Sequence, residues 1–173
     1  IVKGDASSPS ALASGFRLAK QLGKIPVVAG VCDGFIGNRI LARYREAADL
    51  LLLHGATPAQ IDKAMTDFGY AMGPYEAQDM SGLDIAFANR RRQDADRDPN
   101  RIYVRIADKM VEAGRLGRKT GLGWYSYAND GKAGADPLVD ALIIAESDHA
   151  GINRRHFSDD DITKRLLLAM INE

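Results

Sequence analysis

Residues 34–55 read GFIGNRILARYREAADLLLLHG, and this stretch predicts one long amphipathic helix. Its apolar residues recur at spacings of three and four, the period of an α-helix, and so form one stripe for a core. They are Ile36, Ile40, Leu41, Tyr44, Ala47, Ala48 and Leu51. Gly55 stands where helices commonly end. We therefore expect a mainly α-helical protein built around a helix over residues 34–54.

Prolines mark most of the other expected helix starts. Four of them follow Ser, Thr or Asp, whose side chains can accept a hydrogen bond from the free amides of a first helical turn; these are Pro9, Pro58, Pro99 and Pro137. Pro74, after Gly73, is a fifth. The expected helices cover residues 9–22, 58–68, 74–80, 83–92, 99–113, 137–149 and 158–173. Residues 25–31 are expected to form a strand, residues 117–127 a turn and an extended segment, and residues 129–135 a linker.

Composition narrows the class of protein. The chain has 173 residues, 46% of them hydrophobic and 27% charged, which suits a globular protein of about one ordinary domain. Its 23 basic and 23 acidic residues give no net charge, so nothing simple favours nucleic acid or an anionic membrane as a partner. The longest aliphatic run, residues 50–53, is too short to cross a bilayer. We expect a cytoplasmic protein. We also expect no metal site, because the single cysteine, Cys32, and the scattered histidines do not have zinc-ligand spacing.

The charges are distributed unevenly along the chain. Residues 90–119 carry a net charge of +5, and residues 136–173 carry −4. Exposed helix surfaces with local ion pairs would explain this pattern. Attraction of a phosphorylated substrate, or docking of the basic segment on an acidic neighbour, would explain it as well. A helical domain that binds RNA or DNA would rest on residues 90–119 alone.

Asn38 is the candidate for chemistry. It lies near the start of the long helix, where two glycines leave the backbone approachable and a carboxamide could hold a substrate oxygen; a helix cap or a surface residue is the alternative. Residues 121–126 nearly spell a dinucleotide-binding loop, but Ser126 takes the place of the third glycine. We interpret Cys32 as a small packed residue. The three histidines, His54, His149 and His156, are expected at the surface or at helix ends.

Three stretches occur in an order typical of one enzyme family. They are DGFIGNR at residues 33–39, GYAMGPYE at residues 69–76 and GRKTGLGWY at residues 117–125. Together they resemble the C-terminal domain of L-3-hydroxyacyl-CoA dehydrogenases, above all that of multifunctional fatty-acid oxidation enzymes, which also carry an enoyl-CoA hydratase domain. The resemblance covers essentially the whole chain. It implies a helical domain similar to the C-terminal domain of 6-phosphogluconate dehydrogenase, together with a strand and helix from a Rossmann domain.

The resemblance also implies a domain organisation. Residues 1–32 would be the end of an NAD-binding domain, residues 33–130 the first helical domain, and residues 131–173 a linker and the start of a second helical repeat. A faint similarity between residues 165–173 and residues 38–46 agrees with a repeat. The catalytic glutamate and histidine of the family, and its glycine-rich NAD loop, would lie upstream of Ile1. We therefore expect no cofactor-binding residue in this chain.

The implied reaction is the oxidation of the 3-hydroxyl of an acyl-CoA to a ketone, with hydride passing to NAD. Asn38 matches the asparagine of the family that contacts the substrate near its reacting oxygen. Arg39 would brace the domain junction, and the roles of Lys119 and Thr120 stay open. The implied partners are 3-hydroxyacyl-CoA, the Rossmann domain, the second helical repeat and, in a homodimer, a second copy. The parent enzyme would be peroxisomal in a eukaryote, and this chain alone would be inactive. The alternative is a non-catalytic helical association module.

Overall fold

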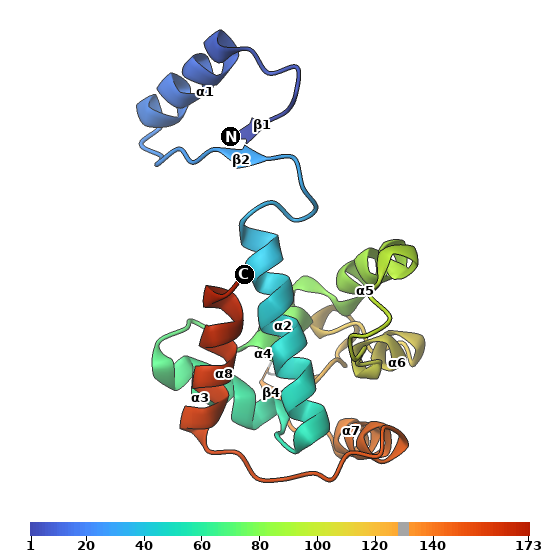
Figure 1. The fold of residues 1–173 in the computed structure, drawn as a ribbon. Coiled ribbons are helices and arrows are strands. Elements are labelled where there is room, and N and C mark those ends of the chain that lie inside the picture. The colour runs from blue at the N-terminus through green and yellow to red at the C-terminus, as the bar shows by residue number, and fades with distance from the viewer. Residues whose placement is uncertain (128–131) are drawn as a thin grey trace.

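The computed structural model describes residues 1–127 and 132–173, which are mostly helical (Figure 1). The α-helices of this part are α1 (Pro9–Gln21), α2 (Gly37–His54), α3 (Pro58–Phe68), α4 (Pro74–Ser81), α5 (Leu83–Arg92), α6 (Ile106–Glu112), α7 (Pro137–His149) and α8 (Asp159–Ile171). Two short 3₁₀ turns are η1 (Asp94–Asp96) and η2 (Arg118–Thr120). The strands are β1 (Val2–Lys3), β2 (Ala29–Gly30), β3 (Ser126–Tyr127) and β4 (Ala133–Gly134).

The first 30 residues form a small βαβ unit that stands apart from the other helices (Figure 1). Strand β1 pairs in parallel with β2, and Val2 lies opposite Ala29. Helix α1 joins the two strands and begins at Ser8, whose hydroxyl accepts a hydrogen bond from the Ala11 amide. The unit buries little apolar surface, since α1 has no buried residue and Ile25 is 92% exposed.

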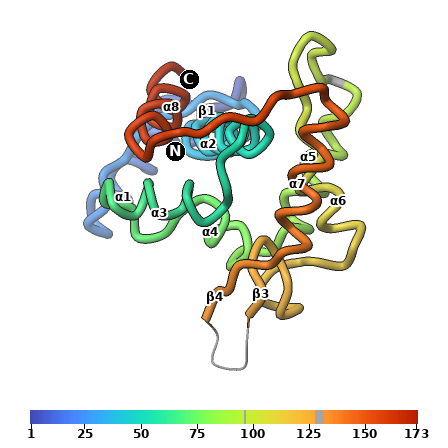
Figure 2. The backbone as a smooth tube through the Cα atoms, turned by 90° about the horizontal axis from the view of Figure 1, so that it is seen from below, coloured from blue at the N-terminus to red at the C-terminus, as the bar shows by residue number. Residues whose placement is uncertain are grey.

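The core of the helical body lies around α2. Helix α8 packs along α2 and α3, while α4 and α7 also contact α2 (Figure 1). The strands β3 and β4 form an antiparallel hairpin at one end of the body (Figure 2). Fully buried side chains come from α2, α3, α4, α6, α7 and α8 and from the segment before β3. They include Ala48, Leu52, Ile61, Met65, Tyr75, Ile106, Met110, Trp124, Ile143, Ile162 and Leu166. The apolar stripe predicted for the long helix faces the core at Tyr44, Ala48 and Leu51. Ile36, expected at the start of that stripe, precedes α2 and is exposed.

Most of the expected helix signals work as predicted. Thr57 accepts a hydrogen bond from the Gln60 amide at the start of α3, and Asp136 accepts one from the Leu138 amide at the start of α7. Ser158 and Asp161 bond to each other's backbone at the start of α8, a capping box. At the other ends, Gly55 and Gly69 follow α2 and α3 with φ angles of 132° and 121°, which favour glycine.

The helix expected over residues 99–113 is wrong in its first half, because α6 begins only at Ile106. The Asp98 side chain accepts a hydrogen bond from the Asn100 amide, and the Arg101 amide donates to the Asp98 carbonyl. This local turn competes with a helix for the same amides. Asp followed by Pro therefore makes a turn here.

Three further boundaries differ from the prediction. Helix α2 starts at Gly37, three residues late, because Gly34 and Phe35 have φ angles of 77° and 49°. The strand expected over residues 25–31 is confined to Ala29–Gly30, where β1 gives it a partner. In the linker expected over residues 129–135, residues 133–134 form β4, and residues 129–131 lie outside the described residues. Among the described residues, no helix is long and apolar enough to span a bilayer.

Candidate functional site

Asn38 lies in the first turn of α2 and is exposed. Its amide donates to the Gly34 carbonyl at 3.0 Å, and its side chain makes no hydrogen bond with the described part of the chain, residues 1–127 and 132–173. The neighbouring apolar side chains Phe35 and Ile36 are 44% and 49% exposed. A free carboxamide beside exposed apolar side chains can donate to, or accept from, an oxygen group of an amphipathic ligand.

The backbone before Asn38 is held in one conformation. Gly34 has a positive φ, and a Cβ there would lie 3.0 Å from the Arg39 amide nitrogen. The Asp33 carboxylate accepts hydrogen bonds at 2.9 Å from Arg92 at the end of α5, and it also accepts one from Gln93. Both bonds lower the pKa of Asp33, and the bond from Gln93 has the larger effect. The segment that presents Asn38 is thereby tied to α5.

Arg39, on the next position of α2, contacts the opposite end of the chain. Its Nε and Nη2 donate to Oε1 of Glu173 at 2.9 and 2.6 Å, and Arg43 Nε donates to Oε2 at 3.0 Å. The hydrogen bonds that Arg39 donates to Glu173 are the largest cause that raises the pKa of Arg39. Arg39 therefore ties α2 to Glu173, which lies just beyond the end of α8, and this role is structural.

The second quoted stretch, residues 69–76, is organised by a buried carboxylate of α3. Asp62 accepts hydrogen bonds from the Tyr75 and Glu76 amides, both at 2.9 Å, and from the Tyr125 hydroxyl at 2.7 Å. A Cβ on Gly73 would overlap Asp62. This stretch, as expected, shapes a turn and the start of α4 in the core. Burial raises the pKa of Asp62 to about 6, while the three hydrogen bonds oppose this rise.

The third stretch, residues 117–125, is organised in the same way by Asp79 of α4. Its carboxylate accepts hydrogen bonds from the Trp124 and Tyr125 amides at 2.9 and 3.0 Å and from the Tyr127 hydroxyl at 2.8 Å. A Cβ on Gly117 or on Gly123 would overlap Asp79. Sequence analysis missed both carboxylates. The glycines of the two stretches were the available signal that a side chain or backbone approaches closely there.

Lys119 and Thr120, whose roles were open, support this turn. Lys119 Nζ pairs with Oδ1 of Asp84 in the first turn of α5 at 2.5 Å. The Thr120 hydroxyl accepts a hydrogen bond from the Leu116 amide at 3.1 Å and lies within bonding distance of the Gly117 and Leu122 carbonyls. Both side chains hold the loop in place.

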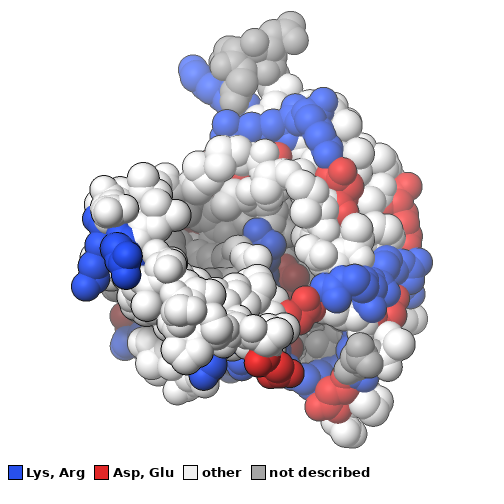
Figure 3. Space-filling model, turned by 90° about the horizontal axis from the view of Figure 1, so that it is seen from above, with Lys and Arg blue, Asp and Glu red and all other residues white. Residues whose placement is uncertain are grey.

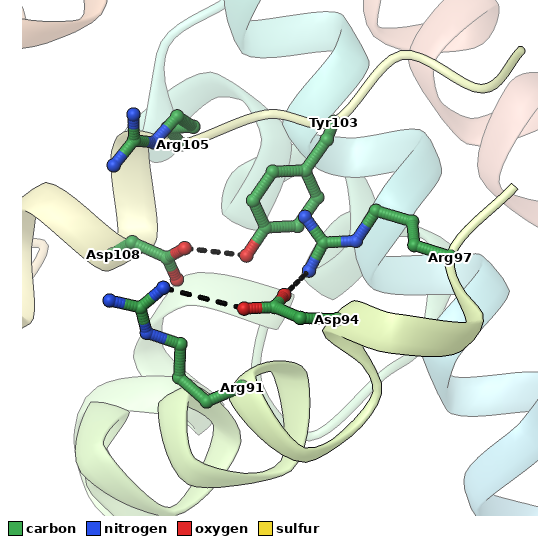
Figure 4. A pocket seen from close by; sticks show the side chains of 6 residues that line it. All are labelled: Arg91, Asp94, Arg97, Tyr103, Arg105 and Asp108. Carbon is green, nitrogen blue, oxygen red and sulfur yellow. Dashed lines mark hydrogen bonds and ion pairs between the residues drawn. The ribbon is translucent and has the colours of Figure 1, made fainter. Parts of the chain in front are cut away.

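The basic segment surrounds a cavity of about 340 Å³ (Figure 4). Its lining side chains are Arg91, Asp94, Arg97, Tyr103, Arg105 and Asp108. Asp94 pairs with both Arg91 and Arg97, and Arg90 donates to Asp108 at 2.7 Å. Two further ion pairs join this segment to the acidic C-terminal part, from Lys109 to Glu146 and from Arg115 to Asp136. Ion pairs with acidic residues outside the segment thus offset its excess positive charge, and part of the segment docks on its acidic neighbour.

The loop over residues 121–126 does not fit NAD. Residues 121–126, which nearly spell a dinucleotide loop, form a tight turn with bridges from Leu122 to Gly117 and Ser126. Gly123 is packed against the Asp79 carboxylate, which would repel a pyrophosphate and leaves no room for one. No group of three or more His, Cys, Asp or Glu side chains that could hold a metal occurs in the described ranges, 1–127 and 132–173.

The remaining candidates are accounted for by position. His54 and His149 are the last residues of α2 and α7, and His156 is exposed, which confirms the expected placement at helix ends or the surface. The interpretation of Cys32 as a packed residue is wrong, because its thiol is exposed. Cys32 precedes α2 in the segment with positive φ angles, where few neighbouring side chains can cover it.

Comparison with known families decides what this arrangement belongs to. The sequence pattern described as 3-hydroxyacyl-CoA dehydrogenase, C-terminal domain, matches residues 34–127, just over half of the chain. The chain belongs to this family. The matched range contains the second and third quoted stretches, all of the first except Asp33, and both buried carboxylates. The family is one of oxidoreductases, and its helical C-terminal domain is the fold found here.

Individual proteins similar to this chain agree with this family assignment. The chain is 42% identical to the peroxisomal bifunctional enzyme of Danio rerio and 37% identical to the fatty acid oxidation complex subunit alpha of a Psychrobacter strain. All of the chain is covered in both comparisons, but only 26% and 24% of those proteins. The dehydrogenase part of multifunctional enzyme 1 from C. elegans superimposes with a TM-score of 0.70 at 30% identity, over 99% of this chain and 38% of that one. The chain thus spans about a quarter of the length of the curated relatives it matches.

Proposed function

We propose that this chain forms the substrate-side part of a 3-hydroxyacyl-CoA dehydrogenase of fatty-acid β-oxidation. The free carboxamide of Asn38 carries the proposal, because it is exposed at the start of α2 within the matched range. There it would hold and orient the reacting oxygen of the substrate, a task that suits a dipole fixed in advance. NAD and the proton-accepting histidine and glutamate would come from an upstream domain, since the loop over residues 121–126 does not fit NAD.

The N-terminal unit supports an adjoining cofactor domain. Parallel strands normally lie in sheets that are covered on both faces. Here the apolar side chains of Ile25, Val27 and Val31 are 92%, 56% and 74% exposed around β2. We infer that residues 1–32 complete an NAD-binding domain, that residues 33–130 form the first helical domain, and that residues 131–173 begin a second helical repeat. The names of the relatives favour a multifunctional parent and, in a eukaryote, a peroxisomal location, and we propose enoyl-CoA hydratase as the second activity of that parent.

The test uses the assembled enzyme, meaning this chain joined to its NAD-binding domain. Asn38→Ala should lower kcat for oxidation of a 3-hydroxyacyl-CoA by roughly 10–1,000-fold, the cost of losing one positioned polar group. Asn89→Ala, a change of the same size at an exposed position of α5, is the matched control. An Asn38→Ala enzyme with an unchanged rate would remove Asn38 from the active site. Oxidation by this chain alone would show that the upstream groups are not needed.

A non-catalytic association module is the second candidate, and the same exposed apolar surface around β2 favours it. The two candidates differ in whether the assembly that covers this surface oxidises substrate. If the assembled enzyme oxidises no 3-hydroxyacyl-CoA while the chain still binds the NAD-binding domain in sedimentation experiments, the association module is the better description.

A further inference from the structure

Arg45 on α2 is half-buried and lacks an acceptor. Within residues 1–127 and 132–173 it makes no hydrogen bond and no ion pair at contact distance. Every other arginine of that part that is buried or half-buried donates to a carboxylate or a carbonyl; these are Arg43, Arg90, Arg97, Arg115 and Arg154. Arg45 is therefore the exception in a protein that otherwise pairs its enclosed guanidinium groups.

The charges around Arg45 are used elsewhere. Asp49, one turn further along α2, accepts a hydrogen bond from the Tyr75 hydroxyl at 3.2 Å. Arg90 on α5 is paired with Asp108. Burial lowers the pKa of Arg45 and raises that of Asp49 to about 7, so Asp49 is a weak counter-charge. A guanidinium has five N–H donors. Those of Arg45 are not fully buried, so water reaches them, and a ligand with acceptor oxygens can take the place of that water.

Arg45 also lies on the face of α2 that presents Asn38. Seven residues make almost two helical turns, so the two positions are offset by only about 20° and lie about 10 Å apart along the axis. Ala42, between them on that face, is small and exposed. Long helical side chains lean toward the helix N-terminus, which brings the Arg45 guanidinium nearer to Asn38. Seen from the side of the N-terminal unit, the surface is hollowed, and the walls of the hollow are mostly uncharged (Figure 3).

We propose that Arg45 binds an oxyanion of the substrate, roughly 10 Å along α2 from the oxygen held by Asn38, and thereby contributes to specificity. The inference rests on the proposed function. The guanidinium fork matches the two oxygens of a carboxylate or a phosphate. In a 3-hydroxyacyl-CoA, a phosphate of the CoA part could supply this group, and so could a carboxylate at the far end of the acyl chain.

Three substrates separate the two sources in the assembled enzyme. One is a 3-hydroxyacyl-CoA with a methyl end, the second is the same ester with a terminal carboxylate, and the third is the methyl-ended thioester of pantetheine, which has no phosphate. We compare the wild type with Arg45→Gln, Arg45→Lys and the control Arg105→Gln. Arg105 is exposed and, in the described ranges, also has no hydrogen bond or ion pair at contact distance.

Loss of one charge-assisted hydrogen bond should raise KM by about tenfold or more with kcat nearly unchanged. If Arg45 binds a CoA phosphate, Arg45→Gln raises KM for both CoA esters and leaves that of the pantetheine thioester unchanged. If it binds a terminal carboxylate, only the carboxylate-ended ester is affected. Arg45→Lys, which keeps the charge without the fork, should recover part of the loss, and Arg105→Gln should resemble the wild type.

Equal KM values for Arg45→Gln and the wild type with all three substrates would overturn the inference. So would an equal rise for all three, because that indicates a structural role, for instance a water-mediated contact with Asp49. If the wild type oxidises none of them, the proposed function fails. The dissociation constants of CoA and of the carboxylate-ended ester, measured by calorimetry, then decide about Arg45: a tenfold or larger increase in Arg45→Gln supports the oxyanion site, and equal values refute it.

Discussion

Asp79 gives a direct test of how the core is held together. Its Oδ1 accepts a hydrogen bond from the Trp124 amide, and its Oδ2 accepts bonds from the Tyr125 amide and the Tyr127 hydroxyl. In Asp79→Asn one of these oxygens becomes an NH₂ group. The Tyr127 hydroxyl can turn to accept from it, but a backbone amide cannot. Whichever way the new side chain is oriented, one buried N–H loses its acceptor.

The expected cost follows from these contacts. An unpaired buried N–H costs about 1–3 kcal/mol, and losing the charge weakens the remaining bonds by about 1 kcal/mol. Burial raises the pKa of Asp79, because enclosing its charge is unfavourable. A neutral amide at this position does not carry that unfavourable charge, which offsets part of the lost stability. The free energy of unfolding should therefore fall by about 1–3 kcal/mol.

Urea unfolding followed by fluorescence measures this change, because Trp124, the sole tryptophan, is itself a partner of Asp79. With an m value of about 2 kcal/mol/M, the midpoint should fall by about 0.5–1.5 M. Asp67→Asn is the control, since the Asp67 side chain is 61% exposed at the end of α3. If both variants unfold at the same urea concentration, the hydrogen bonds of Asp79 do not stabilise the fold as argued.

Three other perturbations address the rest of the body. Gly73→Ala should lower the free energy of unfolding by about 1–3 kcal/mol or more, because the new Cβ overlaps Asp62 including its Cα; thermal unfolding will show it. Burial raises the pKa of Asp49 from 3.8 to about 7, so the folded state holds this proton more tightly and stability should fall as pH rises from about 4 to about 7. The full shift corresponds to about 4 kcal/mol of unfolding free energy, and partial exposure reduces this to the order of 2 kcal/mol. Urea titrations at several pH values should show that the free energy of unfolding falls with rising pH more steeply in the wild type than in Asp49→Asn. Arg115→Lys should cost about 2–4 kcal/mol, since Lys cannot reproduce the two bonds to the Gly123 carbonyl, and an unchanged denaturation curve would contradict this.

Local signals made most of the helices predictable from sequence. Ser8, Thr57 and Asp136 cap helices because their side chains reach amides only two or three residues away, and this depends on no distant partner. Asp98 has the same local pattern but makes a turn, while Arg97 and Arg101, which flank it, pair with Asp94 and Glu46. The Asp98 side chain and carbonyl accept hydrogen bonds from the Asn100 and Arg101 amides, so the same residue pattern fits a local turn as well as a helix start.

The candidate site was predictable only in part. Asn38 could be proposed because its neighbours form a recognisable stretch, and its exposed side chain makes no hydrogen bond within the part of the chain that the structure describes. Asp62 and Asp79 could not be told from surface acids in the sequence, since the donors that bond to these carboxylates lie up to 63 residues away. Arg45 was equally inconspicuous, because the lack of an acceptor is visible only when all its neighbours are in place.

The two buried carboxylates have a consequence for engineering. Tyr125 donates its hydroxyl to Asp62 and its amide to Asp79, so one residue completes both hydrogen-bonded sets. The loop over residues 117–127 and helices α3 and α4 therefore form one exchangeable part. A chimaera that imports the loop without both helices leaves buried donors without acceptors, whereas a graft of residues 58–127 carries its acceptors along.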